Sequence, residues 1–119
     1  MKILVVEEGR LPEIREIDGS LESMQRIVGG LIQAVYPFEE PVALVCNEEG
    51  KLLGLPMNRQ LKETGDIIHS TFFLCAALPE GESFASLSDG QIARYTKRFR
   101  FPEIFFLLND DVVFVLTDQ

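Results

Sequence analysis

The residues best suited to chemistry lie between positions 94 and 101, where cations alternate with aromatic rings. Arg94, Lys97, Arg98 and Arg100 are four of the eleven basic residues in a 119-residue chain of net charge −8. A guanidinium binds phosphate or carboxylate in a planar fork, and a neighbouring aromatic ring can stack on a flat ligand. The segment therefore predicts a site for a small anionic ligand such as a nucleotide. The alternative is the basic end of an ordinary amphipathic helix.

Other segments offer polar groups for the same ligand. Asn58 and Arg59 directly follow an expected strand, where loops commonly build binding sites, and an amide side chain both donates and accepts hydrogen bonds. In this hypothesis the cations bind phosphate, Tyr36 or Tyr95 stacks on a base, and Asn58 or Thr71 hydrogen-bonds that base. The predicted ligand-binding residues are Tyr36, Asn58, Arg59, Thr71, Arg94, Tyr95, Lys97 and Arg98.

The sequence predicts no catalytic residue and no metal ligand. His69 and Ser70 are adjacent on an expected strand, so their side chains should point to opposite faces and cannot form a nucleophile and base pair. One histidine and two widely separated cysteines do not make a zinc site. No phosphate-binding loop or hydrolase motif occurs, so no cofactor is expected and a hydrolase ranks last.

Composition indicates one α+β domain spanning residues 1–119. Apolar residues make up 46% of the chain, which is enough for one core. Cys46 and Cys75 lie in apolar runs and are expected as buried thiols, although a bridge between adjacent strands stays open. The acidic charge disfavours direct nucleic-acid binding. With no long apolar run and no signal-peptide pattern, we expect no membrane segment and a cytoplasmic protein.

Periodicity predicts a mainly antiparallel sheet of six to eight short strands with two helices. Ser20 is expected to cap a helix that Gly29-Gly30 ends, and Ser88 with Gln91 has the capping-box spacing for a second helix that ends before Pro102. The two strands nearest the end of the sequence are so apolar that a partner subunit is expected to cover them, which predicts a homo-oligomer. The expected strands are residues 2–7, 13–17, 31–36, 42–46, 52–55, 67–78, 104–108 and 112–116.

An ordered series of motifs resembles a known family. The series runs from Glu16-Ile17-Asp18-Gly19-Ser20 through Tyr36-Pro37-Phe38 and Gly54-Leu55-Pro56-Met57-Asn58-Arg59 to the helix at Ser88. The family comprises short proteins on phages, plasmids and integrative elements of Gram-positive bacteria, and it is a domain of unknown function. The resemblance implies no activity, but it does imply an accessory protein of a mobile element.

Two function hypotheses follow. The leading one is a non-enzymatic binding protein that sequesters a small anionic, nucleotide-like ligand in evasion of host defence. The alternative is an acidic protein-interaction module, in which pairs such as Glu39-Glu40, Glu48-Glu49 and Asp110-Asp111 belong to a surface that imitates DNA and inhibits a host protein.

Overall fold

A computed structural model describes residues 1–78 and 83–116, and within them two helices and ten strands form an α+β fold. This confirms the predicted fold class, which is α+β with a mainly antiparallel sheet. The helices are α1 (Leu21–Val28) and α2 (Asp89–Arg98), and the strands are β1 (Lys2–Val6), β2 (Glu13–Glu16), β3 (Ile32–Val35), β4 (Val42–Asn47), β5 (Met57–Gln60), β6 (Ile67–His69), β7 (Phe72–Ala77), β8 (Phe84–Ala85), β9 (Glu103–Leu108) and β10 (Asp111–Leu116).

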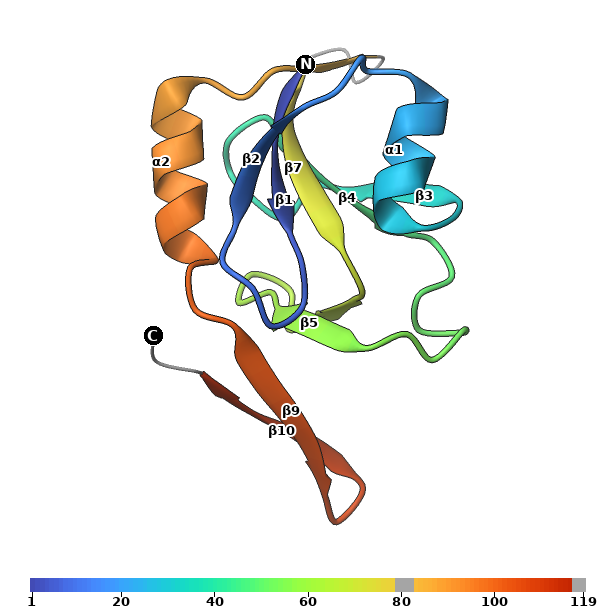
Figure 1. Cartoon of the computed structure of the whole chain (residues 1–119). Coiled ribbons are helices and arrows are strands. Elements are labelled where there is room, and N and C mark those ends of the chain that lie inside the picture. Colours follow the sequence, from blue (N-terminus) through green and yellow to red (C-terminus); the bar gives the residue numbers. More distant parts are fainter. Residues whose placement is uncertain (79–82, 117–119) are drawn as a thin grey trace.

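The main sheet has the strand order β2-β1-β7-β4-β3, and β8 pairs with the end of β7. It lies between the two helices, with α1 on one face and α2 on the other (Figure 1). Alternate residues of a strand point to opposite faces, so β1 places Leu4 and Val6 in the core under α2, and Ile3 and Val5 in the core under α1. Because both faces are covered, the central strands β1, β7 and β4 are apolar at nearly every position.

Both helices begin at the predicted caps. The Ser20 hydroxyl accepts a hydrogen bond from the Ser23 amide, and α1 ends at Gly29, whose φ of 79° is left-handed. At α2, Ser88 and Gln91 form the full capping box. α2 buries Ile92, Tyr95 and Phe99 against the sheet, as their spacing predicts.

Residues 50–61 differ from the prediction. The apolar run at 52–55 is not a strand, and Asn58 and Arg59, which were expected in the loop after it, lie in strand β5. Instead, the Leu53 amide bonds the Glu49 carbonyl in a tight turn that leaves Leu52 83% exposed. The strand forms later, as β5, because there it pairs with β6 in a separate two-stranded sheet. Leu61 and Ile68 of this hairpin complete the core under α2.

The predicted long strand at 67–78 is in fact two strands. Ser70 has a φ of 66°, and its amide bonds the Pro56 carbonyl at 2.6 Å, so the chain turns there. β6 stays with β5, and β7 enters the main sheet. His69 and Thr71 therefore lie on either side of a break, not on one continuous strand.

The two cysteines are buried and free. Cys46 packs in the core under α2 and Cys75 in the core under α1, so the sheet separates them and a bridge between them is excluded. Burial raises the pKa of Cys46 to about 11 and that of Cys75 to about 12, which keeps both thiols protonated.

The last described element is the hairpin of β9 and β10, which projects away from the body (Figure 1). Its turn residues Asn109 and Asp110 have φ angles of 52° and 71°, the positive values of a tight two-residue turn. One hydrogen bond fastens its base, from the Gln60 amide to a Glu103 carboxylate oxygen at 3.1 Å. Among the described residues, no helix is long and apolar enough to span a membrane.

Candidate functional site

The cations of α2 that the sequence assigned to a ligand are paired with carboxylates of the same chain. The Arg94 guanidinium bonds both oxygens of Glu40, and the Tyr95 hydroxyl donates to Glu40 at 2.8 Å. Arg98 binds Glu63 through two hydrogen bonds of 2.6 and 2.8 Å. The two pairs hold the helix to the loops beneath it, which accounts for half of the positive charge that was conspicuous in the sequence.

Tyr95 is buried, and its ring packs on Phe38 at a centroid distance of 4.8 Å. Burial, followed by the hydrogen bond to Glu40, raises the pKa of Tyr95 above its ordinary value. The Arg94 hydrogen bond and then the Tyr95 hydroxyl lower the pKa of Glu40. In this arrangement the Tyr95 ring packs against Phe38 of the same chain, and its hydroxyl donates its hydrogen bond to Glu40.

Arg59 is 0% exposed and lies beneath the end of α2. Its terminal nitrogens donate to Asn58 Oδ1 at 2.7 Å, to the Arg10 carbonyl at 2.8 Å and to the Phe99 carbonyl at 3.0 Å. Its Nε has no hydrogen-bond partner within the described chain. Desolvation lowers the pKa of Arg59, opposed by the charge of Glu103. The guanidinium thus joins the β1–β2 loop, β5 and the end of α2.

The other predicted ligand residues are spread around the same end of the sheet. Asn58 is buried, and its amide donates to the Val6 and Ser70 carbonyls, both at 2.9 Å. Thr71 lies between β6 and β7, half-buried, whereas Tyr36 is exposed beyond β3. The structure brings Asn58, Arg59 and the α2 cations to one end of the sheet, but the side chains there bind the protein's own carbonyls and carboxylates.

Two cations of the basic segment remain available. Lys97 and Arg100 are exposed and form no ion pair within residues 1–78 and 83–116. They border a shallow groove of about 400 Å³ whose other lining residues are Leu11, Pro12, Ala93 and Thr96. We call it the α2 groove. It combines an apolar floor with two free positive charges, which suits an anion that carries an apolar part.

The β9–β10 hairpin presents a cluster of exposed apolar residues. Five of the six residues in each strand are apolar by sequence. Paired residues share a face, so Ile104, Phe106 and Leu108 belong to one face, and Val112 and Leu116 to the other. The exposed fractions are 55% for Ile104, 46% for Phe106, 57% for Leu108, 41% for Val112 and 57% for Leu116. The sequence predicted these two strands and a partner that covers them. The structure adds how far they are exposed, because the two cores of the body form without them.

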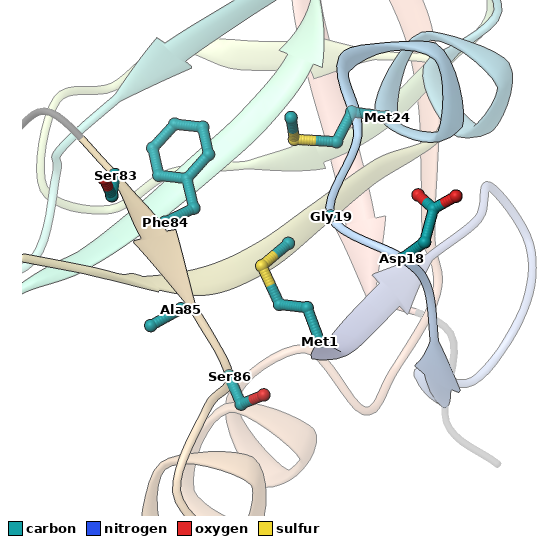
Figure 2. Close-up of a pocket in the computed structure, with 8 residues that line it drawn as sticks. All are labelled: Met1, Asp18, Gly19, Met24, Ser83, Phe84, Ala85 and Ser86. Carbon is teal, nitrogen blue, oxygen red and sulfur yellow. The ribbon is translucent and has the colours of Figure 1, made fainter.

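Another hollow lies elsewhere and contains none of the predicted site residues. It measures about 650 Å³ and is bordered by Met1, Met24 and Phe84, with Asp18 at one side (Figure 2). The Asp18 carboxylate is occupied by the Ser23 hydroxyl and the Ser20 amide, which lower its pKa to about 2. Within residues 1–78 and 83–116, no three His, Cys, Asp or Glu side chains are placed to hold a metal ion.

The Arg98–Glu63 pair makes stability depend on pH in a defined direction. Arg98 lowers the pKa of Glu63, so the pair stabilises the fold above the unfolded-state pKa of Glu63 and loses that contribution as pH falls through the lower folded-state value. We expect Glu63→Gln to lower the free energy of unfolding by about 1 kcal/mol at neutral pH. Urea denaturation of both proteins should show this gap closing below about pH 4.

The matched control for that experiment is Glu48→Gln. Glu48 is exposed and forms no ion pair in the part of the chain that the structure describes. Burial raises the pKa of Glu103, so its contribution to the pH dependence of stability has the opposite sign to that of Glu63. All three proteins contain Glu103, so it does not affect the comparison. A gap between wild type and Glu63→Gln that is the same at every pH would show that the ion pair is not its cause.

The fold and the surface define a small α+β domain with a two-sided sheet and an added apolar hairpin. The family model described as Domain of unknown function (DUF3846) matches residues 1–100, and the chain belongs to this family. The match includes both helices and both cores, whereas β9 and β10 lie beyond it. Searches of the curated proteins and of the solved structures each found no match.

Proposed function

We propose that this protein is a non-enzymatic protein-interaction module whose main contact element is the β9–β10 hairpin. The observation that carries the proposal is the exposure of five large apolar side chains on a hairpin that projects from the body. Exposed apolar patches of this kind mark contact surfaces in proteins of known function. A two-stranded hairpin is also marginal by itself in water, so a partner that covers it would stabilise it.

The geometry favours this reading over ligand sequestration. Arg94, Arg98 and Arg59 each bind groups of the chain itself, so a nucleotide phosphate would have to displace those partners. Ile104, Phe106 and Leu108 form an exposed hairpin face, and no hydrogen bond of their side chains to the described residues would have to be displaced there. The expected mobile-element context and a role against host defence stay predictions, and they would make a host protein the natural partner.

The test is affinity capture with the full chain as bait, followed by a binding measurement with the purified captured protein. We expect Phe106→Ser with Leu108→Ser to weaken that binding at least tenfold, because two half-exposed anchors are lost. The matched control is Leu52→Ser with Leu53→Ser, which changes two exposed leucines on the turn between β4 and β5, outside the hairpin. Equal binding by both double variants would refute the hairpin as the contact element.

The acidic surface is tested in the same assay. The DNA-mimic form of the proposal places the contact on carboxylates instead of apolar side chains. It predicts that Glu48→Lys with Glu49→Lys abolishes binding of the captured protein while the Phe106→Ser with Leu108→Ser variant still binds. The opposite pattern supports the hairpin.

A second candidate function is capture of a small anion in the α2 groove, supported by the unpaired Lys97 and Arg100 beside an apolar floor. A thermal-shift screen against linear and cyclic nucleotides tests it. A ligand that binds there should stabilise the wild type, by about 2.7 kcal/mol at 100 times its dissociation constant, and should not stabilise Lys97→Ala with Arg100→Ala. A shift kept in that variant would place the ligand elsewhere.

A further inference from the structure

We infer that the occupant of the hairpin is a second copy of this chain, joined by a two-fold axis so that each hairpin tip lies beside the base of the other hairpin. The inference rests on the proposed function and names its partner. Three observations carry it: the area that the hairpin exposes, the number of strands it lacks, and the distribution of charge along it.

The exposed area supplies part of a dimer interface. Ile104, Phe106 and Leu108 lie on one face of the hairpin and are each about half exposed. Side chains of this size in that state offer roughly 100 Å² each, so this face offers roughly 300 Å² per copy. Two copies would then bury roughly 600 Å² from these residues, and contacts at the hairpin tip and base would supply the rest of the roughly 1,000 Å² at which a specific interface begins.

A second hairpin also supplies the additional strands that the first hairpin lacks. β9 and β10 form a sheet of two strands, whereas stability in water needs about three or more strands with a covered face. Pairing or packing with an identical hairpin gives four strands. Because both faces are apolar, one partner hairpin can cover the face of Phe106 while the strand edges align. A closed two-fold contact also hides the edge from further association.

The charges select the antiparallel arrangement. The tip carries the carboxylates of Asp110 and Asp111, which are exposed and form no ion pair among the residues described. The base adjoins Arg100 and Lys97, which are exposed cations likewise free of carboxylates in the described ranges. The base also carries the Glu103 carboxylate, which accepts a hydrogen bond from the Gln60 amide, so the two exposed cations outnumber it. Two-fold antiparallel packing puts each acidic tip near these cations of the other copy, whereas parallel packing would put tip beside tip. The interface therefore offers two equivalent charge contacts within a body that is otherwise strongly acidic.

A charge-swap experiment tests this arrangement. The mass of the full chain is measured over a range of concentrations by sedimentation equilibrium, for the wild type, Asp111→Lys and Arg100→Glu. Either variant places like charges at positions 100 and 111 of both contacts, while Asp110 and Lys97 remain, so the net attraction is lost and we expect each variant to dimerise about tenfold more weakly than the wild type. In a mixture of the two variants both contacts become attractive again, so the heterodimer should recover wild-type affinity. Leu52→Ser, on the turn between β4 and β5 and outside the hairpin, should dimerise like the wild type.

The outcomes separate this inference from the proposed function. A wild type that stays monomeric at the highest soluble concentration overturns the inference, and so does a mass that rises beyond two copies. A dimer that Phe106→Ser leaves intact also overturns it. If the protein is monomeric yet loses a captured partner in the Phe106→Ser with Leu108→Ser variant, the proposed function stands and only the second copy is excluded. A dimer with no rescue in the mixed sample overturns the tip-to-base arrangement.

Discussion

Replacing Arg59 by alanine is expected to lower the free energy of unfolding by about 3–5 kcal/mol, the largest effect of any single cation in this chain. The change removes the donors to the Arg10 and Phe99 carbonyls and to Asn58 Oδ1, all buried or part-buried. No water replaces them easily, because the site has no exposure. Three segments that the guanidinium joins would lose their common anchor. Urea denaturation monitored by circular dichroism measures the difference.

The matched control is Arg100→Ala. Arg100 is exposed, forms no ion pair within the described residues, and its guanidinium lies 5.4 Å from the centroid of the Phe101 ring. Its removal should change stability by no more than about 0.5 kcal/mol. If Arg59→Ala were equally mild, the carbonyls would have other donors. Arg59 would then be available to a ligand, as the sequence predicted.

The second large effect is expected from where the chain is cut. A chain ending after Glu103 should still fold, because both cores are built from residues 3–99 and the cut preserves the bond between Glu103 and the Gln60 amide. We expect its free energy of unfolding to stay within about 2 kcal/mol of the full chain, since a projecting hairpin adds little to the core. It should also lose the binding and self-association assigned to the hairpin.

A chain ending after Leu87 provides the contrast. It lacks α2, and so it loses Ile92, Tyr95 and Phe99 from the core under that helix. Burying each such side chain contributes about 1.5–3 kcal/mol, and the three together approach the whole stability of a small domain. This shorter chain is expected to be unfolded by circular dichroism. A folded 1–87 chain, or an unfolded 1–103 chain, would mean that the two cores are not the units of stability described here.

Local chemistry explains what could be predicted. Ser20, Gly29 and the pair Ser88 with Gln91 act on backbone groups within a few residues, so their roles as helix caps are visible in sequence. The spacing of Ile92, Tyr95 and Phe99 likewise defines the buried side of α2.

Predictions that depended on distant residues were less successful. The apolar run at 52–55 has the composition of a strand, but the turn at Gly54 and the pairing of β5 with β6 left it outside any sheet. The run at 67–78 reads as continuous because apolar residues occur on both sides of Ser70, and only its backbone hydrogen bond to Pro56 divides it. Pairing partners, rather than local propensity, decided both cases.

The candidate site shows the same division. The cations at 94–100 were identified by their density, but sequence cannot tell that Glu40 and Glu63, 54 and 35 positions away, neutralise Arg94 and Arg98. It also cannot tell that Arg59 is buried while Lys97 and Arg100 are left free. Charge partners are set by which loops the fold brings under α2, and this information is not local.

The sequence by itself determined the α+β class, both helices with their caps, the apolar central strands and the apolar hairpin, because each depends on periodicity or on contacts between near neighbours. The tertiary structure alone decided which cations bind groups of the protein itself, which side of the sheet each cysteine faces, and that the hairpin lies outside the core. These outcomes depend on long-range packing, in which a body that closes its two cores with residues 3–99 leaves the remaining apolar strands exposed.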